Sequence, residues 1–164
     1  MGYNTGRSTP PDETGPTVSM PFWEDKPLDE LAPEEWEALC DGCGRCCLTK
    51  LEDADTGDVY YTDVACTLLD LETCRCRDYP HRSERVPDCV RLSPDAAHDC
   101  FWLPHTCAYR LRAEGRPLPE WHPLITGTPA TVRTAGLSAC AFAVGEDTLT
   151  ADDDLEDHLL EADT

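Results

Sequence analysis

The chain has 164 residues and a mass of 18.2 kDa, a length that predicts one compact domain without a second independent core. Its 33 acidic and 13 basic residues give a net charge of −20, which argues against direct binding to nucleic acid or to an anionic membrane, because both are bound by clustered positive charge. No apolar run is long enough for a membrane span or an export signal, so we expect a soluble, cytoplasmic protein.

The first part of the chain changes character after about twenty residues. Residues 1–20 are rich in Pro, Gly, Ser and Thr, and they predict a disordered N-terminal arm because they cannot bury enough apolar surface to offset their ordering entropy. Pro33, followed by two acidic residues, predicts a short helix that leads to Cys40. Residues 48–51 and 59–62 flank a turn-forming stretch and predict a β-hairpin.

The second half predicts a few more short elements. Residues 73–91, which contain two prolines and many arginines, predict a loop that needs a cross-link to be ordered. Residues 104–115 predict a helix of about ten residues that carries Cys107. Residues 128–164 predict an acidic extension, with a strand over 137–144 and a terminal helix from Asp152 onward.

Eleven cysteines are the main chemical signal of the sequence. In a reducing compartment, dense cysteine indicates metal binding or redox chemistry more often than a disulfide framework, and the odd count argues against complete pairing. The densest run is Cys40-Asp41-Gly42-Cys43-Gly44-Arg45-Cys46-Cys47. Two residues between cysteines allow both sulfur atoms to reach one metal ion from a tight turn, and the glycines supply the backbone conformations that such turns need.

A second group of cysteines follows this run, and together the two groups hold nine thiols, one more than two four-cysteine sites require. Arg45, Arg75 and Arg77 lie beside the thiols in sequence and are expected to favour their thiolate forms. Thiolate ligands suit zinc and iron, the latter alone or in an iron–sulfur cluster. The contiguous Cys46 and Cys47 do not match the spacing of bacterial ferredoxins.

The pattern Cys-x2-Cys-x2-Cys-Cys resembles the YkgJ-type cysteine-cluster proteins, a family described as a zinc- or iron-chelating domain. Further short motifs in the same order resemble the YcgN branch of that family, among them Thr73-Cys74-Arg75-Cys76, Pro87-Asp88-Cys89, Thr106-Cys107-Ala108-Tyr109 and Leu118-Pro119-Glu120-Trp121-His122-Pro123. The resemblance covers about residues 21–127 and implies a cysteine-cluster metal-binding domain there. The metal ligands that it implies are Cys40, Cys43, Cys46, Cys47, Cys66, Cys74, Cys76, Cys89 and Cys107. It implies no particular reaction.

Other candidate residues are weaker. Cys100 and Cys140 fall outside the family pattern and are expected to be bystander thiols. Residues 53–58 resemble a calcium loop only faintly, because a glycine occupies a position that needs an oxygen ligand, and a solvated hairpin turn is favoured. His122 is expected to anchor its linker through hydrogen bonds rather than to bind metal. Asp63 and Asp88 lie near cysteines in sequence and are weak candidates for accepting hydrogen bonds beside the metal or for a rare oxygen ligand.

These observations predict a small, irregular α+β domain that is organised by metal, with a β-hairpin and a few short helices. The favoured function is chelation of zinc or iron by the cysteine cluster, in a structural role, in metal handling or in binding a protein partner. An iron–sulfur or iron-dependent oxidoreductase, or another enzyme, is the alternative. A disulfide scaffold is the third hypothesis.

Overall fold

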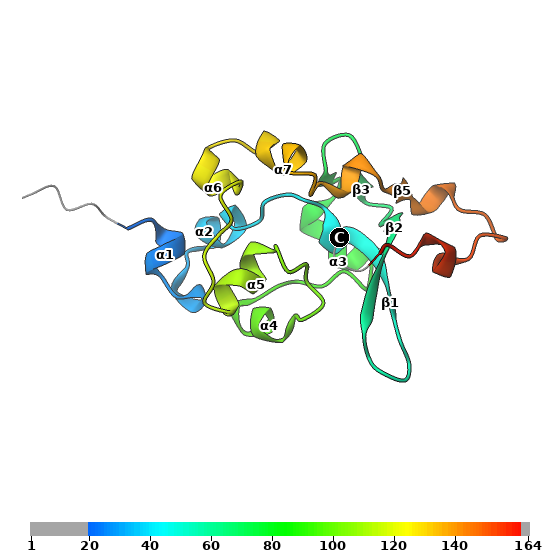
Figure 1. Ribbon diagram of the computed structural model, residues 1–164, viewed down its shortest axis with the longest axis horizontal. Coiled ribbons are helices and arrows are strands. Elements are labelled where there is room, and N and C mark those ends of the chain that lie inside the picture. Colours follow the sequence, from blue (N-terminus) through cyan, green and yellow to red (C-terminus); the bar gives the residue numbers. More distant parts are fainter. Residues whose placement is uncertain (1–19, 162–164) are drawn as a thin grey trace, which may run out of the picture.

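The computed structural model describes residues 20–161, and it shows most of the helices gathered at one end of the molecule and the strands at the other (Figure 1). The protein is a small mixed α+β fold with short helices, a small mixed sheet and a β-hairpin, which confirms the predicted fold class. The predicted N-terminal arm lies outside the described residues, apart from Met20. Each helix within residues 20–161 is too short or too polar to cross a membrane.

The helical end is built from short α-helices and 3-10 turns. The N-terminus of helix α2 is stabilised by local signals. Pro33 fixes its first turn, and the Glu35 carboxylate accepts a 2.9 Å hydrogen bond from the Ala32 N–H. Lys26 donates to the same carboxylate at 2.7 Å and ties α1 to α2. The elements here are α1 (Phe22–Asp25), η1 (Leu28–Glu30), α2 (Pro33–Ala38), α4 (Pro94–Asp99), α5 (Ala108–Ala113), α6 (Pro123–Thr126) and α7 (Ala130–Thr134).

Buried side chains at the helical end form one hydrophobic cluster, which we call the helical core. Trp36 and Tyr109 pack against each other there, with ring centroids 4.6 Å apart, and the Tyr109 hydroxyl donates to the Trp36 carbonyl at 2.9 Å. The core consists of Leu28, Leu39, Ala97, Cys100, Leu103, Ala108, Tyr109 and Leu118.

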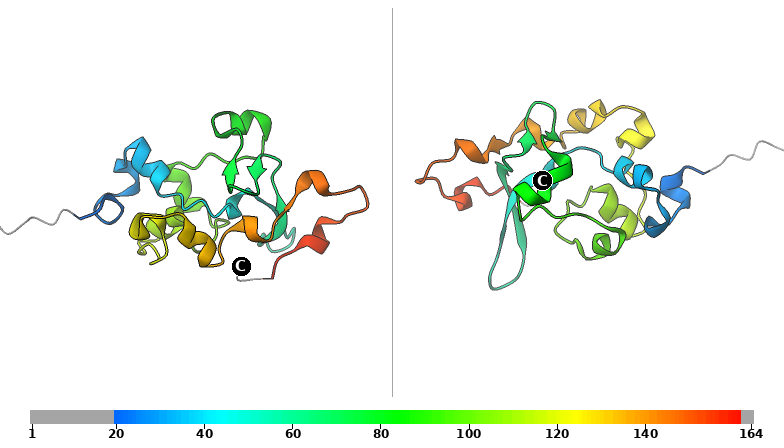
Figure 2. Two further views of the ribbon diagram at one scale, coloured as in Figure 1. Left: turned by 90° about the horizontal axis from the view of Figure 1, so that it is seen from above. Right: turned by 180° about the vertical axis from the view of Figure 1, so that it is seen from behind.

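The strand end contains the predicted hairpin. Strands β1 (Leu48–Glu52) and β2 (Val59–Ala65) are antiparallel, and β5 (Val144–Gly145) adds to β2 in parallel. A second small sheet pairs β3 (Leu69–Asp70) with β4 (Arg75–Cys76). Figure 2 shows the hairpin projecting away from the helices when the molecule is seen from behind.

A second hydrophobic cluster, which we call the strand core, lies among these strands. It contains Leu48, Ala65, Leu69 and Ala139. Leu39 belongs to the helical core and Leu48 to the strand core, so the cysteine-rich run between them connects the two cores. The remaining short elements are η2 (Arg45–Cys47), η3 (Tyr79–His81), α3 (Arg82–Arg85), η4 (Ala139–Ala141), η5 (Glu146–Thr148) and η6 (Leu155–His158).

Two predicted elements are wrong in type. The expected strand over 137–144 is instead irregular around the 3-10 turn η4, and only its last residue enters β5. Ala139 donates its N–H to the Cys43 carbonyl at 2.7 Å rather than to a strand. The expected terminal helix is the four-residue η6. After η6, Leu159 forms an antiparallel bridge with Thr62, and the Leu160 N–H donates to the Tyr61 carbonyl at 2.8 Å. The chain end is therefore extended beside β2 instead of helical.

The expected helix over 104–115 begins later than predicted. Pro104 starts a separate turn, in which the Cys107 N–H donates to the Pro104 carbonyl at 2.9 Å, and α5 follows from Ala108. Gly115, with φ 69°, lies just beyond the end of α5, as the sequence indicates. Cys107 is therefore the N-cap of the helix.

Candidate metal centre

The run from Cys40 to Cys47 folds as a tight double turn. The Asp41 carboxylate accepts a 2.9 Å hydrogen bond from the Cys43 N–H, and Gly42 and Gly44 both have φ 75°. This left-handed conformation favours glycine. A Cβ atom on Gly44 would lie 2.8 Å from the Cys74 sulfur, so the glycine is also needed for the close approach of that residue. The turn therefore presents its four cysteines within one small region.

Chain segments distant in sequence meet this turn. The Cys66 N–H donates to the Cys47 carbonyl at 2.9 Å and brings the end of β2 beside η2. The adjacent Cys47 is the largest cause of the raised pKa of the Cys46 thiol, ahead of desolvation. Desolvation is the largest cause of the raised pKa of Cys107, the N-cap of α5, and the charge on Cys46 contributes to it as well.

Charges on neighbouring cysteines also act on several of the thiols. Desolvation, and after it the charge on Cys46, raises the pKa of Cys40 to about 12. The pKa of Cys107 is also raised to about 12, and desolvation is its largest cause. Desolvation is the largest cause of the raised pKa of Cys89, and the charges of Cys66, Cys76 and Cys46 raise that pKa further. We call the coupled set the thiol cluster: Cys40, Cys43, Cys46, Cys47, Cys66, Cys76, Cys89 and Cys107.

Positive charge is placed beside the thiol cluster. The Lys50 ammonium lies 5.0 Å from the Tyr61 ring centroid and 5.1 Å from that of Trp102, and it donates to the Cys46 carbonyl at 2.8 Å. Desolvation lowers the pKa of Lys50, while the charges of Cys46, Cys47 and Cys66 oppose that shift. Lys50 can thus offset part of the negative charge of several thiolates.

The three arginines expected to favour thiolates have different roles. The Arg75 guanidinium lies against Gly42 and lowers the pKa of Cys40, as expected. Arg45 is buried, donates to the Leu137 carbonyl at 2.8 Å and lies 5.7 Å from the Phe142 ring centroid, so it ties the turn to the C-terminal part of the chain. Arg77 faces Asp70 at 3.6 Å.

One buried oxygen in the region has no hydrogen-bond partner. It is Oδ2 of Asp41, a residue that is 7% exposed. Desolvation, and after it the charge on Asp41, raises the pKa of Cys43. A buried carboxylate oxygen without a partner is costly unless a cation or a proton satisfies it. The soft sulfur donors, together with this oxygen, are chemically suited to zinc or iron.

The thiols are gathered but are not arranged as a finished coordination site. Among residues 20–161, no three Cys, His, Asp or Glu side chains are placed closely enough to hold one metal ion. The fit to zinc or iron therefore lies in the chemistry of the donor set.

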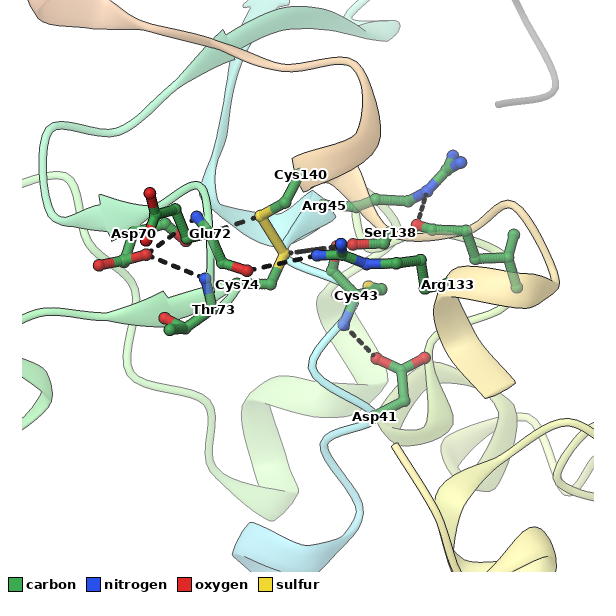
Figure 3. The surroundings of a disulfide bond; sticks show 11 residues. Asp41, Cys43, Arg45, Asp70, Glu72, Thr73, Cys74, Arg133, Ser138 and Cys140 are labelled. Atoms are coloured by element: carbon green, nitrogen blue, oxygen red, sulfur yellow. Dashed lines mark hydrogen bonds between the residues drawn. A yellow bond between two sulfur atoms is a disulfide. The ribbon is translucent and has the colours of Figure 1, made fainter. Parts of the chain in front are cut away.

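Cys74 is the predicted ligand that lies outside the thiol cluster. Its sulfur is bonded to Cys140 of η4, and the bond lies between the turn that follows β3 and the C-terminal part of the chain (Figure 3). A disulfide sulfur is not a thiolate, so ligation by Cys74 remains a prediction for the reduced chain. Cys140 is therefore not the bystander thiol that its position outside the family pattern suggests. The other nine cysteines are free.

The remaining candidates have structural partners. His122 is completely buried, accepts from the Leu124 N–H at 3.1 Å and contacts the Leu39 carbonyl at 3.1 Å, so both ring nitrogens are used in anchoring the linker. Asp63 contacts His158 at 2.7 Å. Asp88 is exposed. Cys100 belongs to the helical core.

Residues 53–58 form the turn of the hairpin. The Asp53 carboxylate accepts hydrogen bonds from the N–H groups of Asp55 and Thr56, both at 2.9 Å. These bonds make the solvated turn that the sequence favours over a calcium loop.

Sequence reasoning did not single out Lys50 or Asp41. Their signals are present in the sequence, because Lys50 is one of two lysines in the chain and Asp41 lies inside the cysteine run. Neither signal shows that Lys50 contacts two aromatic rings or that Asp41 retains an unpartnered oxygen.

Comparison with known proteins defines the class of this site. Residues 39–108 match the CxxCxxCC domain, described as a "Putative zinc- or iron-chelating domain". The matched range contains all eight residues of the thiol cluster, and Cys74 as well. The thiol cluster is thus made of the cysteines of that domain.

The whole chain has close relatives. It is 57% identical over 140 residues to a UPF0260 protein of Azotobacter vinelandii, covering 85% of this chain and 93% of the relative, and 56% identical over 141 residues to one of Sinorhizobium fredii, covering 86% and 90%. A UPF0260 protein of Cellvibrio japonicus is 57% identical over 139 residues, covering 85% and 94%. The chain belongs to the UPF0260 family, the YcgN branch that its motifs resemble. No solved structure matches it.

Proposed function

We propose that this protein binds zinc or iron through the thiol cluster, and that the bound metal joins the helical core to the strand core. The observation that carries the proposal is the tight turn that holds four cysteines between Cys40 and Cys47, to which the end of β2 is hydrogen-bonded at Cys66. After desolvation, the charge on Cys46 also raises the pKa values of Cys40, Cys89 and Cys107. Eight thiols are enough for two four-cysteine sites.

The metal also has a role in folding under this proposal. The small sheets and short helices provide two modest hydrophobic clusters, and the run between Leu39 and Leu48 supplies few apolar contacts of its own. Metal–thiolate bonds formed in the folded state contribute directly to its stability. Binding requires the thiols to rotate into coordination and to release their protons. We place this activity in the cytoplasm, where free thiols persist.

Anaerobic purification followed by elemental analysis tests the proposal. The expected result is stoichiometric zinc or iron, with loss of the metal on treatment with a strong chelator and a simultaneous fall in thermal stability. A folded chain that contains neither metal and does not bind them when they are supplied would overturn it.

The colour of the same preparation separates metal chelation from the oxidoreductase hypothesis. A brown protein that contains iron and acid-labile sulfide indicates an iron–sulfur cluster and directs attention to redox chemistry. A colourless protein with zinc indicates a structural or metal-handling role.

A further inference from the structure

The disulfide between Cys74 and Cys140 differs from the rest of the cysteine chemistry. All eleven cysteines lie within the described residues, and the other nine are free thiols. The two partners are 66 residues apart in sequence, and one of them lies outside the matched domain of residues 39–108. In thiol-rich chains of reducing compartments, a single disulfide is more often a redox-active group than a scaffold bond.

Polar groups beside the disulfide can serve as hydrogen-bond partners for the two cysteines when they are reduced. The Cys74 sulfur lies 3.6 Å from the Cys43 carbonyl oxygen and 3.5 Å from the Ser138 hydroxyl, and the Cys140 sulfur lies 3.7 Å from the Asp70 carbonyl oxygen (Figure 3). A thiol is a weak hydrogen-bond donor. Each sulfur therefore has a polar partner for its proton when the bond is broken.

The two sulfurs differ in access and in location. Cys74 is 9% exposed, whereas Cys140 is half-buried, so a small reagent reaches the pair more readily through Cys140. The contact between Cys74 and the Cys43 carbonyl places Cys74 at the edge of the thiol cluster. The disulfide links this edge to η4, which leads into β5.

We propose that Cys74 and Cys140 are a reversible dithiol–disulfide site that exchanges with small disulfides, and that its reduction adds Cys74 to the thiol cluster as a ninth thiol. The second half of this proposal rests on metal binding by the cluster, whereas the first half does not. The site would couple the C-terminal part of the chain to the metal centre.

The exchange oxidises Cys74 and Cys140 to the disulfide and reduces one small disulfide to two thiols. In the oxidising direction, the Cys140 thiol loses its proton, and its sulfur attacks a small disulfide such as oxidised glutathione, forming a mixed disulfide and releasing one glutathione thiolate. The Cys74 sulfur, after losing its proton, attacks the Cys140 sulfur and releases the second glutathione. The two cysteines lose two electrons and two protons in all, and one glutathione disulfide becomes two thiols.

A redox titration tests the first half. The full chain is equilibrated with defined ratios of reduced and oxidised glutathione, quenched with an alkylating agent and digested for mass spectrometry. We expect one two-electron transition in which two alkylated thiols disappear and the peptides of Cys74 and Cys140 become linked. Cys140→Ser should abolish the transition, while the control Cys100→Ala should retain it. A folded wild-type chain that forms no such link, or whose link excess glutathione cannot break, would overturn the first half.

Protection by metal tests the second half. In the reduced chain, zinc should slow alkylation of Cys74 at least tenfold and leave Cys140 reactive. If zinc protects the thiol cluster but not Cys74, the second half is wrong while the proposed function stands. If zinc protects no cysteine, the proposed function and the second half fail together, and the glutathione titration still decides the first half.

Discussion

Leu39 is buried in the helical core and Leu48 in the strand core, and the eight residues between them carry four cysteines. The two cores are therefore joined through the same short run that forms the centre of the thiol cluster. Metal binding and the relative placement of the two cores should consequently be coupled.

Replacing Cys46 tests this coupling at the centre of the cluster. Cys46→Ser should lower the metal content by at least one ion per chain and reduce the free energy of unfolding by about 3 kcal/mol, since both the sulfur ligand and the contacts that the metal holds are lost. Elemental analysis and chemical denaturation measure the two effects.

Cys100→Ser is the matched control for Cys46→Ser. Cys100 lies in the helical core, so its substitution should affect stability without affecting the metal content. Equal metal loss in the two variants would show that Cys46 has no special role.

Gly44 provides a test of the packing between the cysteine turn and the disulfide. Gly44→Ala introduces a Cβ atom 2.8 Å from the Cys74 sulfur, in addition to the cost of a left-handed alanine. Gly115→Ala has a similar backbone conformation, φ 69°, with no atom within 4 Å of the added Cβ. The control should lose about 1 kcal/mol of stability and Gly44→Ala about 3 kcal/mol, because overpacking adds to the backbone cost. Similar losses in thermal denaturation would refute the close approach.

His122 should matter for stability and not for metal. His122→Ala removes the buried ring and leaves the Leu39 carbonyl and the Leu124 N–H without their partner, so it should reduce the free energy of unfolding by about 3 kcal/mol. His122→Gln should recover part of that loss. Both variants should keep the wild-type metal content. Metal loss in the Gln variant at unchanged stability would instead identify His122 as a ligand.

His122 should also make the free energy of unfolding depend on pH. Burial lowers the pKa of His122 below the usual 6.5, so the folded chain binds this proton less readily than the unfolded chain does. The contribution of His122 to stability is complete above about pH 6.5 and is lost as the pH falls through that value toward the lowered pKa. Denaturation curves of wild type and His122→Gln should therefore converge on acidification. Parallel curves would contradict the assignment.

The hairpin turn should respond to acid and not to calcium. Hydrogen bonds from the Thr56 and Asp55 backbones lower the pKa of Asp53, so the turn is stabilised above about pH 4 and loosens as the pH falls through the lowered pKa. Amide exchange over residues 53–58 should quicken in acid, and less so in Asp53→Asn. A calcium-induced slowing of that exchange at neutral pH would revive the calcium loop.

Sequence patterns predicted the elements that depend on local signals. The hairpin, the helix beginning at Pro33 and the end of α5 near Gly115 follow from turn residues, proline and glycine. The strand expected over 137–144 failed because contacts with the distant Cys43 and Cys74 decide that segment's conformation. Pairing of Cys74 with Cys140 was likewise beyond the sequence, since spacing alone does not fix which cysteines meet.

X-ray absorption at the zinc or iron edge of anaerobically purified protein tests the central claim most directly. The account predicts a first shell dominated by sulfur, about 2.3 Å from the metal for zinc, with close to four sulfur neighbours per ion. A shell of nitrogen and oxygen neighbours alone, or a folded protein that binds neither metal, would contradict it.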